Sequence, residues 1–131
     1  MALKVSLKPH EKIIIAGAVI TNGNLSTDLI IENKVPILRG KDILKKAEAN
    51  SPANKIYFVI QLMYMDTDNL AEHHKLYWEL VRNFIKAAPS TLGLITRISE
   101  HILGAHYYKA LKYARKLIKY EHMLLSGVKD L

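Results

Sequence analysis

An amphipathic pattern over residues 106–125 constrains the fold of this chain more than any other feature. On a helix that advances about 100° per residue, the apolar side chains fall on one stripe and the basic ones on the opposite arc. The stripe comprises Tyr107, Leu111, Ala114, Ile118 and Leu125. The arc comprises Lys109, Lys112, Arg115, Lys116 and Lys119, with Tyr108 inside it and Tyr113 and Tyr120 at its border. The pattern predicts a helix that buries one face and offers positive charge and aromatic rings to an anionic partner.

The charge and composition of the chain narrow the classes of partner and compartment. Its 131 residues carry a formal net charge of +7, which favours nucleic acid, an acidic protein surface or anionic lipid. There are no cysteines, so disulfides and thiolate chemistry are excluded. The first residues lack the apolar core of a signal peptide, and the longest apolar run, residues 56–65, is too short to cross a bilayer. We therefore expect a soluble cytoplasmic protein that does not enter the membrane.

Residues 3–39 predict a small antiparallel β-sheet of three or four strands. Residues 3–7 alternate in polarity, and residues 13–20 are rich in β-branched side chains, which favour strands. The cluster Asn22-Gly23-Asn24 indicates a turn before two further short strands, and Pro36 suits an edge strand or a bulge because it cannot donate a ladder hydrogen bond. A sheet of this size buries little apolar surface, so we expect it to lean on the helices or on a second copy.

Helix signals follow residues 41–50, which predict either a short helical turn or a linker. Ser51-Pro52 predicts the N-cap and first turn of a helix. The Ile, Tyr, Phe and Val residues that follow also suit a strand, but the Ser-Pro start and the Gln-Leu-Met segment favour a mostly buried helix. Asp66 or Asp68 is expected to cap a second helix that runs to Ala88, and Ser90 to cap a third, which Gly104 separates from the last. The residues expected to be buried on the second helix are Leu70, Leu76, Tyr77, Trp78, Leu80, Val81 and Phe84.

These elements place the chain in the α+β class. The expected architecture is a small N-terminal antiparallel β-sheet followed by a bundle of about four α-helices. A β-rich lobe with its linker would occupy residues 1–50 and a helical lobe residues 51–131, together forming one compact unit.

Motifs for catalysis, cofactors and metals are absent from the sequence. There is no Gly-rich nucleotide loop, no Gly-x-Ser-x-Gly elbow and no cysteine nucleophile. His73 and His74 are adjacent, so they point to different sides of a helix, and His101 and His106 lack the spacing of a zinc-binding helix. We therefore expect no catalytic residue, no cofactor and no metal, and a protein that is not an enzyme.

Four blocks in a fixed order cover nearly the whole chain and resemble the FlbT family of flagellum biosynthesis repressor proteins. The blocks are LKVSLKPHEKIIIAGAVITNG, KVPILRGKDIL, SPANKIYFVIQLMYMD and HYYKALKYARKLIKYE. One departure is His10, which stands where the family is expected to have a glycine in a Lys-Pro-Gly-Glu turn. The resemblance implies a post-transcriptional regulator that acts on the 5′ leader of flagellin messenger RNA and promotes its decay. It also implies a link to flagellin and to the flagellar protein FlaF.

The β-rich part also resembles the carbon storage regulator family of small RNA-binding proteins. The similarity rests on Pro9-x-Glu11-x-Ile13 and on Val35-x-Ile37-x-Arg39, a short and loosely spaced match. In that family an arginine after the last strand contacts RNA, which implies such a role for Arg39. The alternative is that Arg39, with the lysines after it, belongs to a polar linker.

Two functional hypotheses follow. In the first, the protein binds the flagellin messenger RNA leader through phosphate contacts and base stacking. Its candidate RNA-binding residues are Arg39, Lys41, Tyr108, Lys109, Lys112, Arg115, Lys116 and Lys119. In the second, the helical lobe binds flagellin or FlaF, any effect on the messenger is indirect, and the basic helix suits an acidic amphipathic partner. A separate alternative for the last helix is that its basic face is an ordinary solvated surface opposite a packed stripe. A homo-oligomer is compatible with both.

Overall fold

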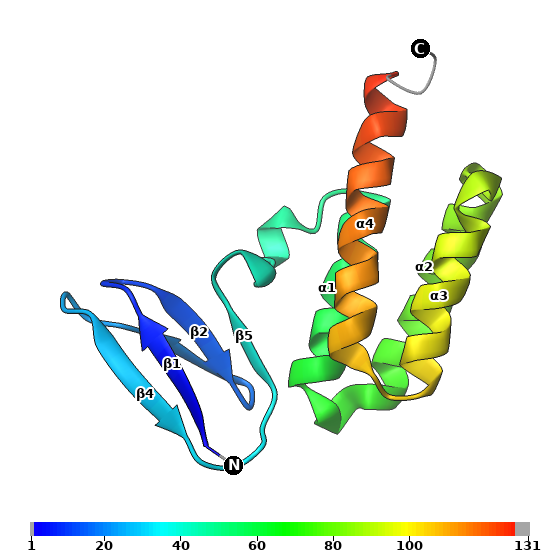
Figure 1. The fold of residues 1–131 in the computed structure, drawn as a ribbon. Helices are drawn as coiled ribbons and strands as arrows, with labels where there is room; N and C mark the ends of the chain where they lie inside the picture. The colour runs from blue at the N-terminus through cyan, green and yellow to red at the C-terminus, as the bar shows by residue number, and fades with distance from the viewer. Residues whose placement is uncertain (1, 128–131) are drawn as a thin grey trace. The chain divides into compact units, whose positions relative to one another are not determined.

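The chain folds into two compact units, residues 1–43 and residues 44–131 (Figure 1). The computed structural model describes residues 2–127. The first unit contains only strands and turns apart from one short 3-10 turn, and the second contains all four α-helices. The α+β class expected from the sequence is confirmed, with antiparallel strands preceding four helices.

Five short strands build the first unit: β1 (Leu3–Leu7), β2 (Lys12–Ile15), β3 (Ala18–Thr21), β4 (Thr27–Ile31) and β5 (Ile37–Arg39). They form two antiparallel sheets, β1 with β4 and β3-β2-β5. Val5, Leu7 and Ile13 make a small core, against which partly buried residues of β2, β4 and β5 pack.

Residues 13–20, expected as one strand, are a β-hairpin. Ala16 and Gly17 form its two-residue turn, and both have positive φ, 50° and 86°. Positive φ at both turn residues matches the right-handed twist of the flanking strands. This turn explains why the unit has more strands than expected, because Ala-Gly is a weaker turn signal than Asn-Gly.

A second tight turn connects β1 and β2 and contains His10. His10 has φ of 63°, a left-handed conformation that glycine adopts more readily than a residue with a Cβ. The turn is closed by hydrogen bonds from the Glu11 backbone N–H to the Lys8 carbonyl at 3.1 Å, and from the Lys8 N–H to Glu11 Oε1 at 2.9 Å. A glycine, which the resemblance leads us to expect at this position, would adopt this positive φ with less strain than histidine.

The second unit consists of α1 (Pro52–Met65), α2 (Leu70–Ala87), α3 (Leu92–Leu103) and α4 (Tyr107–Ser126). Helix α1 packs against α2 and α4, and α4 packs against α1 and α3 (Figure 1). The side chain of buried Gln61 in the apolar α1 makes two hydrogen bonds with Leu44: Oε1 accepts from the Leu44 N–H at 2.8 Å, and Nε2 donates to the Leu44 carbonyl at 2.9 Å. No helix of residues 2–127 is both long and apolar enough to cross a membrane.

The expected caps are correct for α1 and wrong for the next two helices. Ser51 caps α1, its Oγ accepting a hydrogen bond from the Asn54 N–H at 3.2 Å. Neither α2 nor α3 has a side-chain cap: Asp66 instead ends α1 and contacts His73, and Ser90 contacts Tyr120. Short 3-10 turns precede both helices and complete their first turns without a side chain.

The burial expected for α2 is also partly wrong. Tyr77, Val81 and Phe84 are buried, whereas Leu76 and Trp78 are 45% and 36% exposed. Burial raises the pKa of Tyr77 to about 12, and its hydroxyl lies 2.8 Å from Ser99 Oγ on α3. Trp78 instead borders a hollow lined by α2 and α3, with its ring 5.0 Å from that of Tyr77.

The buried stripe of α4 is rotated from the expected one. Its buried residues are Ala110, Leu111, Ala114, Leu117 and Glu121, while Leu125 is 77% exposed. Helix α4 lies between α1 and α3, so the two alanines allow close approach and Leu117 is covered. Glu121 is buried because it completes the α1 cap, accepting from Ser51 Oγ at 2.6 Å and from the Ala53 N–H at 2.9 Å.

Candidate nucleic-acid interface

The basic arc of α4 lies on the surface, opposite the buried stripe. Lys109, Lys112, Lys116 and Lys119 are exposed, and Arg115 is half-buried. Within α4 the only acidic residue is Glu121, whose carboxylate is turned to the start of α1. No acidic side chain of the same helix therefore neutralises the arc, and its charges add to one positive field.

On its α3 side, the arc borders a shallow hollow of about 400 Å³. The lining residues are His101, Lys109, Lys112, Tyr113 and Lys116. The ring of Tyr113 stacks on His101, with centroids 5.2 Å apart and planes 18° from parallel. The Lys116 ammonium lies 4.9 Å from the Tyr113 ring centroid and the Arg97 guanidinium 5.9 Å from it. This geometry gathers cations from two helices around one aromatic ring.

The ring of Tyr108 contacts the Lys112 ammonium in the same way. The Lys112 ammonium lies 5.2 Å from the Tyr108 ring centroid, and Tyr108 is 41% exposed. The electron-rich face of a tyrosine attracts a cation without cancelling its charge. The tyrosines therefore hold lysine ammonium groups in defined positions that remain able to contact phosphate.

Arg115 marks the opposite edge of the arc, toward α1. Its guanidinium lies 5.1 Å from the ring centroid of Tyr57 and donates a hydrogen bond to the Tyr57 hydroxyl at 3.1 Å. Tyr57 is buried, so this contact joins α4 to α1. Among the expected RNA-binding residues of α4, Arg115 thus has a packing role that the exposed lysines lack.

Arg39 and Lys41 lie in the first unit, away from the α4 arc in sequence. Arg39 Nη2 lies 2.9 Å from Glu11 Oε2 and donates to the Ser6 carbonyl at 2.7 Å. The Lys8 backbone N–H and the Arg39 guanidinium lower the pKa of Glu11. Arg39 is therefore an ion-paired residue of the β-rich unit, while Lys41 is exposed in the 3-10 turn Gly40–Asp42.

Sequence reasoning missed the contribution of α3 to the hollow. Arg97 is exposed and His101 is half-buried, and they are four residues apart on one side of α3. The spacing could have suggested a shared face, but only the packing of α3 against α4 places that face beside the lysines. The structure thus adds Arg97 and His101 to the candidate interface.

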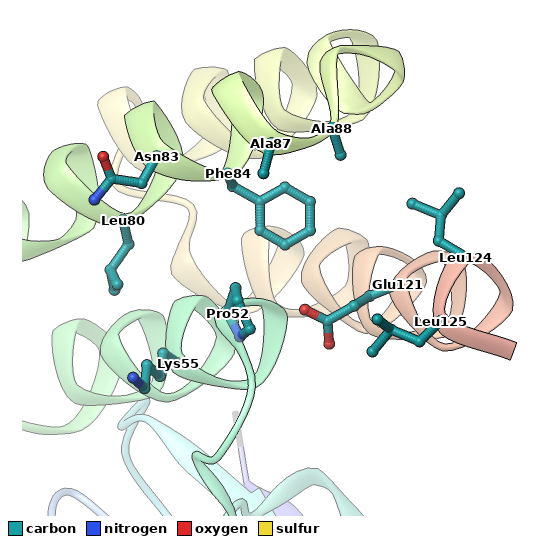
Figure 2. A pocket seen from close by; sticks show the side chains of 10 residues that line it. All are labelled: Pro52, Lys55, Leu80, Asn83, Phe84, Ala87, Ala88, Glu121, Leu124 and Leu125. Carbon is teal, nitrogen blue, oxygen red and sulfur yellow. The ribbon is translucent and has the colours of Figure 1, made fainter.

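A second hollow, of about 440 Å³, lies among α1, α2 and α4 (Figure 2). Its walls are mostly apolar, with Phe84 and Leu124 pointing inward, and the Glu121 carboxylate reaches it from α4. That carboxylate already accepts hydrogen bonds from Ser51 and Ala53. The hollow therefore offers apolar surface and no paired acid and base. Among residues 2–127, no cluster of three or more His, Asp or Glu side chains could hold a metal.

Comparison with known proteins supplies the family. The family model described as "Flagellar protein FlbT" matches residues 3–125. A "Probable flagellum biosynthesis repressor protein FlbT" of Rhodopseudomonas palustris is 44% identical over 126 residues, which cover 96% of this chain and 99% of the relative. A similarly named protein of Bradyrhizobium diazoefficiens is 48% identical over 125 residues, covering 95% of this chain and 85% of the relative.

The "Flagellum biosynthesis repressor protein FlbT" of Caulobacter vibrioides is 38% identical over 130 residues, covering 98% of this chain and 92% of the relative. No solved structure matches the chain. The family match extends through the β-rich unit and all four helices, so it includes the turn of His10, Arg39 and the basic arc of α4. The resemblance seen in the sequence is confirmed, and the chain belongs to the FlbT family of flagellar proteins.

Proposed function

We propose that this protein represses flagellum biosynthesis by binding RNA, without catalysis of its own. The relatives are named flagellum biosynthesis repressors, which supports the regulatory role. The observation that carries the RNA proposal is the α4 arc, where exposed lysines are held by tyrosine rings beside the α3–α4 hollow. The proposed target is the 5′ leader of flagellin messenger RNA, and binding promotes degradation of that messenger.

The geometry favours a single-stranded or looped segment of the leader. Phosphates contact Lys109, Lys112, Lys116 and Lys119 along the helix, and the exposed ring of Tyr108 is available to an unpaired base. Phosphate contacts position the strand, and base contacts supply sequence preference. Arg39 and Lys41 form a secondary contact in the β-rich unit, weaker because Glu11 already neutralises Arg39.

The test is direct binding of the purified protein to the leader RNA at several salt concentrations. Affinity falls linearly with salt on a double-logarithmic plot, with a slope of about −0.7 per phosphate contact for a single strand. Replacing Lys109, Lys112 and Lys116 together by Gln lowers the magnitude of that slope by about 2. The matched control replaces three exposed lysines outside α4, Lys55 on α1 and Lys75 and Lys86 on α2, by Gln and leaves the slope unchanged. An unchanged slope in a folded triple variant contradicts RNA binding by this arc.

A protein partner is the second candidate, favoured by apolar residues exposed on α2 and α3. Trp78, Leu92 and Leu103 are 36%, 54% and 73% exposed. The proposed partners are flagellin and FlaF, whose binding would couple messenger repression to the state of flagellum assembly. A pull-down with each protein, beside the RNA assay, separates the two candidates. Capture of a partner without RNA affinity supports the second alone, and RNA affinity without capture supports the first.

A further inference from the structure

An apolar groove runs between α2 and α3. It has a volume of about 500 Å³. Its lining residues are Trp78, Val81, Arg82, Ile85, Leu92, Ile95, Thr96, Ser99, Glu100 and Leu103. Val81 and Ile95 form a buried floor, while Trp78, Leu92 and Leu103 stand at its margins with large exposed areas. The hydrogen bond between Tyr77 on α2 and Ser99, one of the lining residues on α3, joins the two helices.

The dimensions of the groove match a helix. Leu92 and Leu103 are eleven residues apart on α3, which corresponds to about 16 Å, or three helical turns. On α2 the apolar lining recurs at Trp78, Val81 and Ile85, spacings of three and four residues that present one continuous ridge. An apolar lining from two helices with a buried floor is the kind of surface in which an amphipathic helix lays its apolar face.

The charges beside the groove are arranged asymmetrically. On the α2 side, Arg82 lines the groove, and Lys75 and Lys86 lie seven residues before it and four after it, on the same side of the helix. All three are exposed, and none takes part in the ion pairs found among residues 2–127. Glu79 lies on the same side, four residues after Lys75 and three before Arg82, which leaves this margin with a net charge of +2; on the α3 side the groove is lined by Glu100. The α2 margin therefore attracts carboxylates.

We propose that the groove between α2 and α3 binds an amphipathic helix of a partner protein whose apolar stripe is flanked by acidic residues on the side facing α2. This inference rests on the second function proposed above and names its surface and the chemistry of its partner. Apolar side chains of the partner helix cover Trp78, Leu92 and Leu103, and its carboxylates pair with Arg82 and the two lysines. The α4 arc of a second copy does not match this partner, because its exposed face is basic.

Binding of a helix in the groove can be followed by tryptophan fluorescence, because Trp78 is the single tryptophan of the chain. A designed 18-residue peptide with leucines at positions i, i+3, i+4 and i+7, and glutamates on one flank, serves as the probe, and it contains no tryptophan. Titration with this peptide shifts the Trp78 emission to the blue and protects it from acrylamide quenching. The same peptide with lysines on that flank binds at least about tenfold more weakly, because it meets the basic margin of α2.

Single substitutions locate the site. Leu103→Glu and Leu92→Glu each weaken binding of the acidic peptide about tenfold or more, because each places a carboxylate in the apolar contact. Leu125→Glu, on an equally exposed leucine of α4 outside the groove, binds as the unchanged protein does. Arg82→Glu reverses the preference between the two peptides. Circular dichroism and thermal melting establish that every variant is folded.

Three results overturn the proposal: no spectral change with the acidic peptide, equal binding of both peptides, or equal loss in Leu125→Glu. A blue shift that grows with protein concentration without peptide assigns the groove to self-association, which also overturns it. The leader RNA assay is run on the same variants. Leu103→Glu keeps the RNA affinity of the unchanged protein. Loss of peptide binding in the groove and loss of RNA binding are therefore measured separately.

Discussion

The cations of α4 and the cation of Arg39 are held in place by opposite means. Lys112 and Lys116 lie against the rings of Tyr108 and Tyr113, 5.2 and 4.9 Å from their centroids. Arg39 lies against the Glu11 carboxylate, with 2.9 Å between Nη2 and Oε2. A tyrosine ring orders a cation and leaves its charge, whereas a carboxylate orders a cation and cancels it. A basic side chain thus keeps its charge available at the surface of one unit and supports the fold of the other.

The largest expected effect on RNA affinity comes from charge reversal, which should affect the α4 arc more than Arg39. Replacing Lys112 and Lys116 together by Glu lowers the affinity for leader RNA about a hundredfold or more, because two phosphate contacts become repulsive. Arg39→Glu lowers it less than about tenfold, since the paired arginine contributes little free charge. Fluorescence anisotropy with labelled RNA at low salt measures both variants. A larger loss for Arg39→Glu in a folded protein would reverse the comparison.

The second largest expected effect on RNA affinity comes from removing a tyrosine ring. Tyr113→Leu removes the ring that orders Lys116, Arg97 and His101, and lowers RNA affinity a few-fold, in line with about 0.5–1 kcal/mol for an exposed cation–π contact. Tyr113→Phe keeps the ring and is the matched control, with an affinity close to that of the unchanged protein. Equal losses in both variants would assign the effect to the hydroxyl, which accepts from Arg97 at 3.4 Å.

Acid should lower the stability of the β-rich unit, because its ion pair depends on the Glu11 carboxylate. Hydrogen bonding from Lys8, then the Arg39 guanidinium, lowers the pKa of Glu11 from its usual 4.5. The ionised form therefore stabilises the fold above pH 4.5, and this stabilisation is lost as the pH falls through the lowered pKa. Denaturant unfolding followed between pH 6 and pH 2 should show this loss in the unchanged protein and a smaller one in Glu11→Gln.

The control for the acid effect is Asp28→Asn, a second carboxyl of the same unit. Its pKa is lowered by the Ser6 hydroxyl and by Lys4, without Arg39. Asp28→Asn should leave the Glu11 contribution to the pH profile intact, and the double variant should flatten the profile further than either single change. A pH profile that is identical in Glu11→Gln and the unchanged protein would show that the ion pair does not stabilise the unit.

The smallest expected effect concerns the turn that presents Glu11 to Arg39. His10 holds φ of 63°, so His10→Gly relieves left-handed strain and raises the free energy of unfolding by up to about 1 kcal/mol. The gain is limited because glycine also increases the entropy of the unfolded chain. Chemical denaturation measures it, with His10→Ala, which keeps the Cβ, as the control. A gain in His10→Ala equal to that in His10→Gly would trace the effect to loss of the imidazole.

Local patterns account for the parts of the structure that were predicted correctly. Ser51-Pro52 specified the start of α1, because a hydroxyl acceptor and a preset φ act within one turn. The spacing of lysines along α4 specified its exposed arc, because helical geometry alone places those residues opposite the buried stripe. Tight turns without Asn-Gly, such as Ala16-Gly17, left too weak a local signal to be recognised.

Contacts between distant residues account for the parts that were not predicted. Glu121 looks like a surface residue in its local pattern, yet it is buried because the N-terminus of α1, nearly seventy residues earlier, supplies its donors. The buried stripe of α4 is rotated because α4 packs against two helices at once. Periodicity along one helix carries no information about how many neighbours surround it.

The sequence by itself determined that residues 106–125 would form a basic, tyrosine-rich helix and that its lysines would share one face, since both follow from spacing on a single helix. Only the tertiary structure decided what surrounds those lysines. The packing of α3 against α4 brought Arg97 and His101 to Tyr113, and the pairing of β5 with β2 placed Arg39 near the Glu11 turn. Charge and spacing are local properties, whereas the partner that holds or cancels each charge is chosen by packing.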